Sequence, residues 1–208
     1  HYSMAASLKH PGALFNLGRC FEKGIGTGLN QDKATKHFRE AAELKHPEAL
    51  TKLGRYYERG IGVAVDLIKA WIHYNAALNS GMASADSDMK RLLESIRRMK
   101  SYRPKAEIFF RTCERCISTG LMDVLPLLAE CYFTGTGVHR SMQKAYEHFE
   151  MALKERLTRS NTVVLRLKSI KRQMRRRWSL SSFISRAWRP LSKNANDSDD
   201  GSMTHTSR

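Results

Sequence analysis

The residues in this sequence best suited to chemistry are two cysteines three positions apart. Cys113 and Cys116 form a Cys-x-x-Cys pair, a spacing that occurs in redox sites and in half of many zinc sites. A structural zinc ion takes four ligands, and no second Cys-x-x-Cys or closely spaced histidine pair supplies the other two. Because residues 106–119 show helical periodicity, we expect these thiols to pack as small apolar groups, with a metal or redox role as the alternative.

A run of alternating glycines offers a second kind of chemistry. Residues 24–28 read Gly-Ile-Gly-Thr-Gly, and glycines let backbone N–H groups approach a phosphate. The run lacks the Gly-Lys-Ser/Thr end of a P-loop, and no predicted strand precedes it. The same Gly-x-Gly spacing recurs at 60–62 and 135–137. A turn that recurs in this way indicates architecture rather than a nucleotide site.

Three histidines, His37, His73 and His148, recur at equivalent positions. Neighbouring helices pack about 10 Å apart, which is too far for these side chains to share a metal with bonds of about 2 Å. We therefore expect histidines at the boundary of the core. No Ser–His–Asp set or carboxylate pair stands out, so the sequence predicts neither an enzyme nor a bound cofactor or metal.

These motifs recur because the chain repeats itself. A shift of 36 residues places residues 8–11 on 44–47 and residues 17–19 on 53–55, and a shift of about 75 residues places 60–63 on 135–138. The intervening segment, 83–120, keeps helical periodicity but lacks the glycine turn. Its apolar positions are Met89, Leu92, Leu93, Ile96 and Met99, then Ile108, Phe109, Cys113 and Ile117.

Each repeat has the composition of a helix pair. Pro47 suits a first helical turn, where a missing N–H costs nothing. Gly54 lies mid-helix, which costs about 1 kcal/mol relative to Ala, so we expect the paired helix to approach it closely. Asp66 is placed to cap the second helix. The equivalent residues of the first repeat are Pro11, Gly18 and Asn30.

This pattern resembles the Sel-one-like repeat, a relative of the tetratricopeptide repeat. The matching residues are Ala49, Leu53, Gly54, Tyr57, Gly60, Gly62, Val63, Asp66, Lys69, Ala70, Tyr74 and Ala77. The resemblance implies an all-α fold, a right-handed α-solenoid of antiparallel helix pairs that serves as an adaptor. It does not identify a partner, because the matching residues are packing residues.

The predicted organisation has three parts. Residues 1–157 form the solenoid, with repeats at about 11–46 and 47–82, a degenerate unit at 83–120 and a last repeat at 121–157. Residues 158–190 form a basic amphipathic helical tail, and the polar residues 191–208 are expected to be disordered. No apolar run approaches the roughly 20 residues of a membrane span.

The net charge of +16 is concentrated in the tail, where Asn161 is expected to cap a helix that ends at Arg177. One helical face is apolar: Val163, Leu167, Ile170, Met174 and Trp178. The cationic residues around it are candidates for binding an anionic partner: Arg166, Lys168, Lys171, Arg172, Arg175, Arg176 and Arg177. Arg176-Arg177-Trp178-Ser179 matches the sites of basophilic kinases, which makes Ser179 a possible phosphorylation site.

Four interpretations of this tail remain open. It could cap the solenoid, bind an anionic membrane surface, bind an acidic protein, or bind nucleic acid. The predicted function is accordingly a non-catalytic adaptor, with a peripheral membrane or nucleic-acid binder acting through the tail as the alternative. A partner protein or peptide would lie in the solenoid groove, and self-association is also open. The groove candidates, chosen because they fall off the apolar stripe, are Asn16, Arg19, Lys52, Arg55 and Tyr56.

The compartment is the least determined property. Few and unpatterned cysteines favour a reducing compartment such as the cytoplasm. Since the sequence starts at His1, a targeting signal upstream of it would not be seen.

Overall fold

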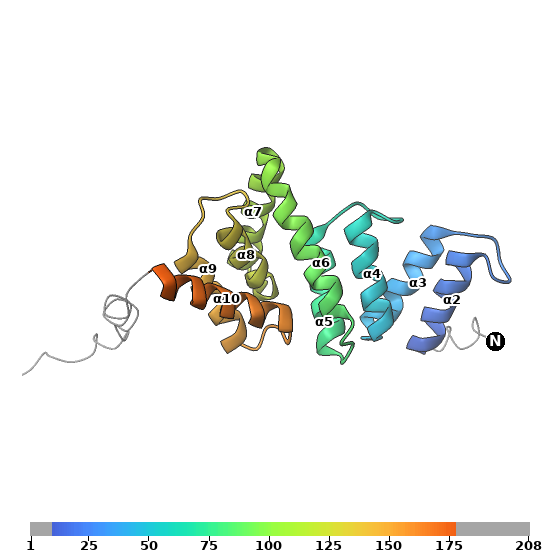
Figure 1. The fold of residues 1–208 in the computed structure, drawn as a ribbon. Helices are drawn as coiled ribbons and strands as arrows, with labels where there is room; N and C mark the ends of the chain where they lie inside the picture. The colour runs from blue at the N-terminus through green and yellow to red at the C-terminus, as the bar shows by residue number, and fades with distance from the viewer. Residues whose placement is uncertain (1–9, 178–208) are drawn as a thin grey trace, which may run out of the picture. The chain divides into compact units, whose positions relative to one another are not determined.

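The computed structural model describes residues 10–177, with side chains up to residue 174, and every regular element in this range is helical (Figure 1). The helices are α2 (Pro11–Lys23), α3 (Gln31–Glu43), α4 (Pro47–Arg59), α5 (Leu67–Asn79), α6 (Ala85–Arg98), η1 (Met99–Ser101), α7 (Arg103–Ser118), η2 (Met122–Val124), α8 (Leu125–Thr134), α9 (Met142–Lys154) and α10 (Asn161–Arg177). The prediction of an all-α solenoid of helix pairs is confirmed. The chain divides into two compact units at the Arg172–Gln173 bond.

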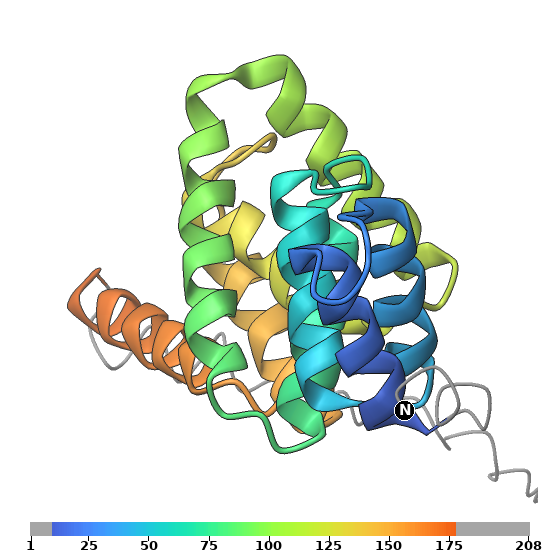
Figure 2. The same cartoon turned by 90° about the vertical axis from the view of Figure 1, so that its right-hand side faces the viewer.

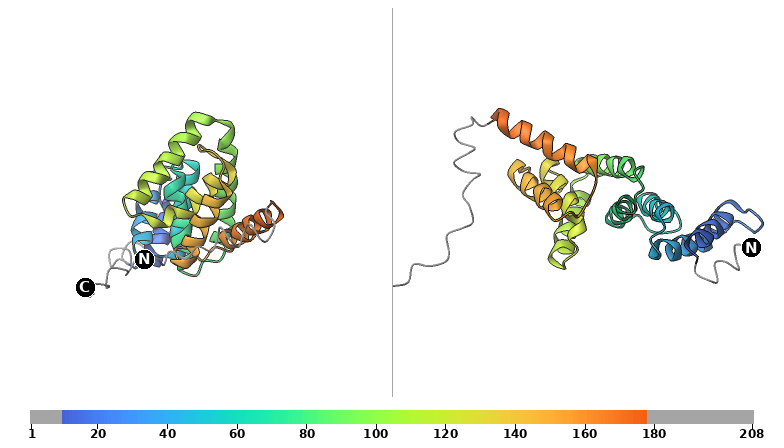
Figure 3. Two further views of the ribbon diagram at one scale, coloured as in Figure 1. Left: turned by 90° about the vertical axis from the view of Figure 1, so that its left-hand side faces the viewer. Right: turned by 90° about the horizontal axis from the view of Figure 1, so that it is seen from below.

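Among the described residues, three helix pairs pack closely, α2/α3, α4/α5 and α8/α9, and the helices of the degenerate segment, α6 and α7, lie between the second and third pairs in chain order (Figure 3, right). The predicted start signals are confirmed. Pro11 and Pro47 lie in the first turns of α2 and α4. The Asn30 side chain accepts a hydrogen bond from the Lys33 N–H, and Asp66 accepts from Ile68 and Lys69. The caps fix where each second helix begins.

Glycine turns connect the two helices of each repeat and lie at one end of the pairs, as Figure 2 shows for α2–α3 and α4–α5. The first glycine of each turn is left-handed, with φ of 74° at Gly60 and 77° at Gly135, a conformation that other residues rarely adopt. In the second and last repeats, the second glycine lies against the preceding unit. A Cβ on Gly62 would meet Thr35, and one on Gly137 would overlap the backbone of Ala106.

The mid-helix glycines lie under aromatic rings of the partner helix, as the sequence predicted. A Cβ on Gly18 would lie 2.7 Å from the Phe38 ring, and one on Gly54 would overlap the ring of Tyr74. Phe38, Tyr74 and the third-repeat equivalent Phe149 are fully buried. The absence of a side chain on Gly54 therefore lets a large ring fill the space between the helices.

The degenerate segment forms two helices that pack mainly on neighbouring helices rather than on each other, α6 on α5 and α8, and α7 on α8. Its predicted core needs one correction. Met89, Leu92, Leu93 and Ile96 of α6 are buried, as expected. In α7, however, the buried face consists of Ala106, Phe110 and Cys113, and the side chain of Ile108 is 67% exposed. The buried residues of α7 follow the i, i+4, i+7 spacing that starts at Ala106. Ile108 does not fall on this spacing, so its side chain lies on the exposed face of the helix.

Helix α10 begins at Asn161, so Asn161 is not its cap, contrary to the prediction. The preceding Ser160 accepts a hydrogen bond from the Val163 N–H at 3.4 Å. Asp86 of α6 accepts further bonds at this end, at 2.5 Å from the Ser160 hydroxyl and at 3.1 Å from the Thr162 hydroxyl. Ser160 is therefore the local cap of α10. Asp86 adds to it by accepting the Thr162 N–H at 3.2 Å, a contact from another helix that local sequence cannot reveal.

Candidate partner-binding surfaces

The predicted groove candidates divide into exposed and buried residues. Arg19 and Arg55 are exposed, whereas Asn16 and Lys52 are half-buried. Tyr56 is only 2% exposed, so its choice as an exposed groove residue is wrong. Its ring packs edge-on against Phe38 of the preceding repeat.

Tyr56 belongs instead to a polar contact between the first two repeats. Its hydroxyl donates to a carboxylate oxygen of Glu22 at 2.7 Å, and the Lys52 ammonium donates to the same oxygen at 2.8 Å. Burial acts to raise the pKa of Glu22, but these two hydrogen bonds outweigh it and the pKa is lowered. The carboxylate is therefore held in its charged form between α2 and α4.

A second polar contact joins α4 to the degenerate unit. Arg55 donates to Asp88 at 3.1 Å, and Arg91 donates to Asp88 and to Glu58, each at 2.7 Å. Asp88 is buried, so two cations offset its charge. If a partner draws Arg55 away, Arg91 still pairs with Asp88. A partner can therefore bind Arg55 with a smaller loss of folding stability than it would cause by binding Arg91.

The three recurring histidines form a repeated stack. In each repeat an aromatic ring of the first helix lies between a histidine and a lysine of the second helix, with ring centroids 5.4 to 5.6 Å apart. The three sets are Phe21–His37–Lys33, Tyr57–His73–Lys69 and Tyr132–His148–Lys144. Burial, followed by the neighbouring lysine, lowers the pKa of His73. These histidines are packing residues at the core boundary.

The cysteine pair does not act as a unit. Cys113 is buried and its thiol interacts with Cys131 of α8, whereas Cys116 is half-buried. The interaction with Cys131, followed by burial, raises the pKa of the Cys113 thiol. Between residues 10 and 177, no group of three or more His, Cys, Asp and Glu side chains is placed to hold a metal ion.

The apolar face of α10 is buried as far as Ile170. Val163 and Ile170 are fully buried, and Leu167 is nearly so. Met174 is half-buried, and Trp178 lies outside the described residues. Residues 158–172 belong to the same compact unit as the repeats. Within this stretch the apolar face packs on protein.

The cationic candidates of α10 differ in their surroundings. Arg166 is paired within the chain, at 3.2 Å from both Glu94 and Glu130. Lys168, Lys171 and Arg172 are exposed, with the Lys171 ammonium 5.2 Å from the centre of the Tyr146 ring. The side chains of Arg175, Arg176 and Arg177, and Ser179 as a whole, lie outside the described residues.

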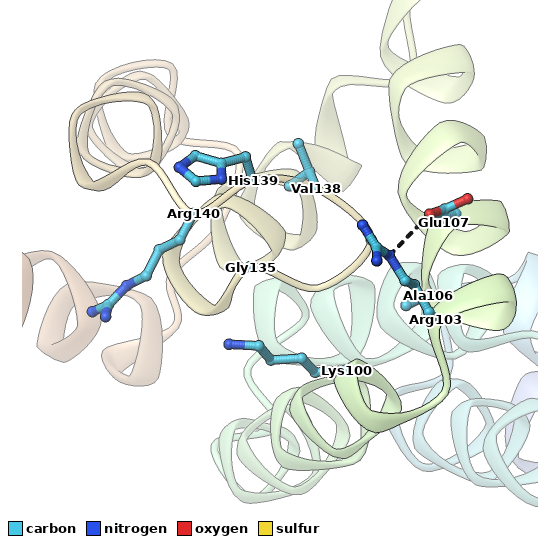
Figure 4. A pocket seen from close by; sticks show the side chains of 9 residues that line it. Lys100, Arg103, Ala106, Glu107, Gly135, Val138, His139 and Arg140 are labelled. Carbon is cyan, nitrogen blue, oxygen red and sulfur yellow. Dashed lines mark ion pairs between the residues drawn. The ribbon is translucent and has the colours of Figure 1, made fainter.

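A basic pocket that the sequence did not indicate lies between the degenerate unit and the glycine turn of the last repeat (Figure 4). It has a volume of about 550 Å³ and is lined by Lys100, Arg103, Ala106, Glu107, Gly135, Gly137, Val138, His139 and Arg140. Lys100, Arg103 and Glu107 come from the degenerate unit, whereas Gly135, Gly137 and Val138 belong to the glycine turn of the last repeat, so only the fold brings them together. A 36-residue comparison could not find them, because the degenerate unit lacks the glycine turn.

Hydrogen bonds and ion pairs fix most of the charges around this pocket. The Lys100 ammonium donates to the Thr134 carbonyl at 2.9 Å, and the Arg140 Nε donates to the Phe133 carbonyl at 3.0 Å. Arg103 lies 3.5 Å from Glu107 and is 89% exposed. Figure 4 shows Arg103 beside the turn and paired with Glu107, with Lys100 extending toward Gly135 from the other side. Cations outnumber carboxylates here.

The chain is similar to known repeat proteins. The Sel1 repeat family matches residues 11–46, 47–82 and 127–155. Among solved structures, a Sel1 repeat protein from Oxalobacter formigenes is 25% identical with a TM-score of 0.44, covering 81% of this chain and 65% of that one. The antigen c5321 of uropathogenic Escherichia coli, described as displaying an SLR fold, is 23% identical with a TM-score of 0.41, covering 83% and 36%.

The chain therefore spans less than two thirds of the length of each of these two proteins. No curated protein matches the chain at a significant level.

Proposed function

We propose that this chain, which contains three Sel1 repeats, is a non-catalytic adaptor that binds another protein or a peptide. Sel1 repeat proteins generally mediate protein–protein interactions, and their repeats are typically non-catalytic scaffolding. The partner and its binding mode are specific to this chain and are the content of the proposal.

One observation carries the proposal: the first two repeats keep the same buried contacts and present an exposed arginine at the same position of their first helices. The ring over the mid-helix glycine recurs in the first two repeats, and the lysine and histidine contacts with an aromatic ring recur in all three. At the arginine position, Arg19 and Arg55 are exposed, whereas the last repeat has the buried Glu130. Equivalent exposed arginines on successive repeats suit recognition of an extended partner.

The groove hypothesis places the contact on the first helices of the repeats, with Arg19 and Arg55 as its exposed anchors. Arginine is enriched among residues that dominate binding energy at interfaces. The Arg19 guanidinium lies over the Phe15 ring at 6.0 Å, which limits its freedom before binding. Asn16 and Lys52 are half-buried neighbours that add polar contacts.

The test is affinity capture from cell extract with three forms of the whole chain. They are the parent, the Arg19→Ala/Arg55→Ala variant and a matched Arg39→Ala/Arg111→Ala variant that removes two exposed arginines elsewhere. Groove binding predicts that the first variant loses its partners while its circular dichroism spectrum remains that of the folded parent, and that the second variant keeps them. Because Arg55 pairs with the buried Asp88, a modest fall in the melting temperature of the first variant is expected. Equal capture by both variants would remove the groove from the proposal, and no specific capture by the parent would end it.

The alternative is an anionic membrane or nucleic-acid binder acting through the tail. The burial of Val163, Leu167 and Ile170 counts against insertion of this face of α10 into a membrane. None of the helices described between residues 10 and 177 is long and apolar enough to cross a bilayer. A chain stopped after Arg177 preserves α10, whereas one stopped after Leu157 would expose the core. Loss of binding on the former truncation, with steep weakening as salt rises, would favour the tail.

A further inference from the structure

We propose that the basic pocket between the degenerate unit and the last repeat binds an acidic peptide segment, with side-chain carboxylates as the recognised groups. This inference rests on the proposed adaptor function and names the chemistry of the partner. The pocket comprises Lys100, Arg103, Ala106, Glu107, Gly135, Gly137, Val138, His139 and Arg140.

The pocket exists because the degenerate unit departs from the repeat pattern. In the other units a glycine turn directly follows the first helix, but here α6 continues into η1 and α7 begins at Arg103. The change places Lys100 and Arg103 at the end of the pairs where the turns lie. Opposite them, Gly137 lies directly against Ala106 and contributes no side chain of its own. The result is an open space bordered by cations.

The charges of the pocket favour an anion. Lys100, Arg103 and Arg140 carry full positive charges, against the single carboxylate of Glu107. The Arg103–Glu107 pair is exposed, with Arg103 89% and Glu107 45% accessible, so it contributes little stability. Arg103 can therefore exchange Glu107 for a ligand carboxylate, to which guanidinium binds with two parallel hydrogen bonds.

The positions of the cations indicate separate carboxylates rather than one compact anion. The Lys100 ammonium is tied to the Thr134 carbonyl, next to Gly135, whereas Arg103 reaches the turn from α7 (Figure 4). Arg140 extends away from Arg103, with its Nε bonded to the Phe133 carbonyl. A peptide with Asp or Glu at several positions can satisfy such separated groups as its chain crosses the turn.

The lining argues against nucleic acid as the occupant. None of the nine residues is Phe, Tyr or Trp, so the pocket offers no benzenoid or indole surface on which bases could stack. Glu107 would also repel a continuous phosphate backbone, whereas a peptide can place a backbone N–H or an apolar side chain near it. Ala106 and Val138 provide small apolar contacts of that kind.

The experiment measures binding of a fluorescent glutamate-rich peptide to the whole chain by anisotropy, at about 0.15 M salt, where distant charges are screened. Because the basic tail can attract the same peptide, the informative comparison is between two charge reversals on α7. Arg103→Glu alters the pocket, and Lys105→Glu makes the same charge change at an exposed residue that does not line it. Both variants should retain the parent melting temperature.

The proposal predicts roughly tenfold weaker binding for Arg103→Glu and less than about twofold for Lys105→Glu. Glu107→Gln should bind about two- to threefold more tightly than the parent, because it removes the competing carboxylate. The proposal would be overturned if the two charge reversals weakened binding equally. It would also be overturned if the parent protein bound a peptide with glutamine in place of glutamate more tightly than the glutamate-rich peptide. The proposal would likewise be overturned if an oligothymidylate bound more tightly than the peptide and Arg103→Glu weakened that binding.

Failure of this inference is distinguishable from failure of the adaptor function. If Arg103→Glu leaves both peptide binding and partner capture intact while Arg19→Ala/Arg55→Ala abolishes capture, only the pocket assignment falls. If the parent captures no specific partner, the adaptor proposal is wrong, and the pocket assignment is wrong as well.

Discussion

The guanidinium of Arg166 in α10 lies 3.2 Å from the carboxylate of Glu130 in α8, a residue with no exposed surface. Neither carboxylate oxygen of Glu130 accepts a hydrogen bond from a described residue. Burial raises the pKa of Glu130 to about 7, although the Arg166 charge opposes this shift. Arg97 also opposes it, and Glu94 adds to it. The contact that joins α10 to the last repeat is therefore titratable near neutral pH.

Glu130→Gln should flatten the dependence of stability on pH. The pKa of Glu130 rises from 4.5 to about 7, so the folded state binds its proton more tightly than the unfolded state does. The free energy of unfolding should thus fall as pH rises through this window, by about 3 kcal/mol in total. Urea denaturation between pH 4.5 and 8 measures this, and the parent should lose stability relative to Glu130→Gln as pH increases.

The difference between parent and variant isolates this carboxylate. His73 and His148 have lowered pKa values, so their protonation opposes folding as pH falls, but they titrate equally in both proteins. A parent–variant difference that is constant over the whole range would mean that Glu130 keeps one protonation state throughout.

Gly54→Ala should destabilise the protein by about 2 kcal/mol, despite the higher helix propensity of alanine. The added methyl group would overlap the buried ring of Tyr74, which cannot move without breaking its 2.7 Å hydrogen bond to Glu58. The matched control is Gly28→Ala, because a Cβ there meets no atom within 4 Å. Thermal melting should separate the two, and a Gly54→Ala protein as stable as the control would contradict the close packing.

Asp86→Ala should loosen α10 from the repeats. The Asp86 carboxylate accepts hydrogen bonds from Ser160 and Thr162, so its removal should cost about 2 kcal/mol. Trypsin should then cut after Arg166 faster than in the parent. Asp32→Ala provides the control, since Asp32 is an exposed carboxylate in the first turn of α3. Equal cleavage rates in the two variants would show that Asp86 does not hold α10.

Alkylation should distinguish the two cysteines of the Cys-x-x-Cys pair. Burial and the neighbouring Cys131 raise the pKa of Cys113, so little thiolate is present and access is poor. Iodoacetamide at pH 8 should modify Cys20 and Cys116, which are half-buried, well before Cys113. Peptide mass spectrometry of the native protein measures the order. Rapid modification of Cys113 in the folded protein would refute its burial.

Local sequence signals predicted the helix pairs, but they could not predict contacts between residues far apart in the sequence. The capping role of Asp66 and the close approach at Gly54 follow from residue type and spacing, and both are confirmed. Tyr56 falls off the apolar stripe of its own helix, yet the neighbouring repeat buries it through Phe38 and Glu22. The periodicity of one helix describes that helix alone, and says nothing of what a neighbouring repeat places against it.

The same limit applies to charged residues. Arg166 has the spacing of a solvent-facing cation on an amphipathic helix, but its partners, Glu94 and Glu130, lie more than 30 residues upstream. The basic pocket was missed for a similar reason, because Lys100 and Arg140 are distant in sequence and share no motif. Such sites become visible only when the packing order of the helices is known.

The second glycine of each turn restricts how these repeats could be recombined in an engineered protein. Gly62 faces the side chains of Thr35 and Gln31, whereas Gly137 faces the Ala106 backbone, so the two junctions are shaped differently. A chimaera that joined residues 127–155 directly to the first repeat would confront Gly137 with side chains in place of a backbone surface. Designed arrays built from this chain would therefore keep the last repeat behind the degenerate unit, and would extend more readily by duplicating the junction between the first two repeats.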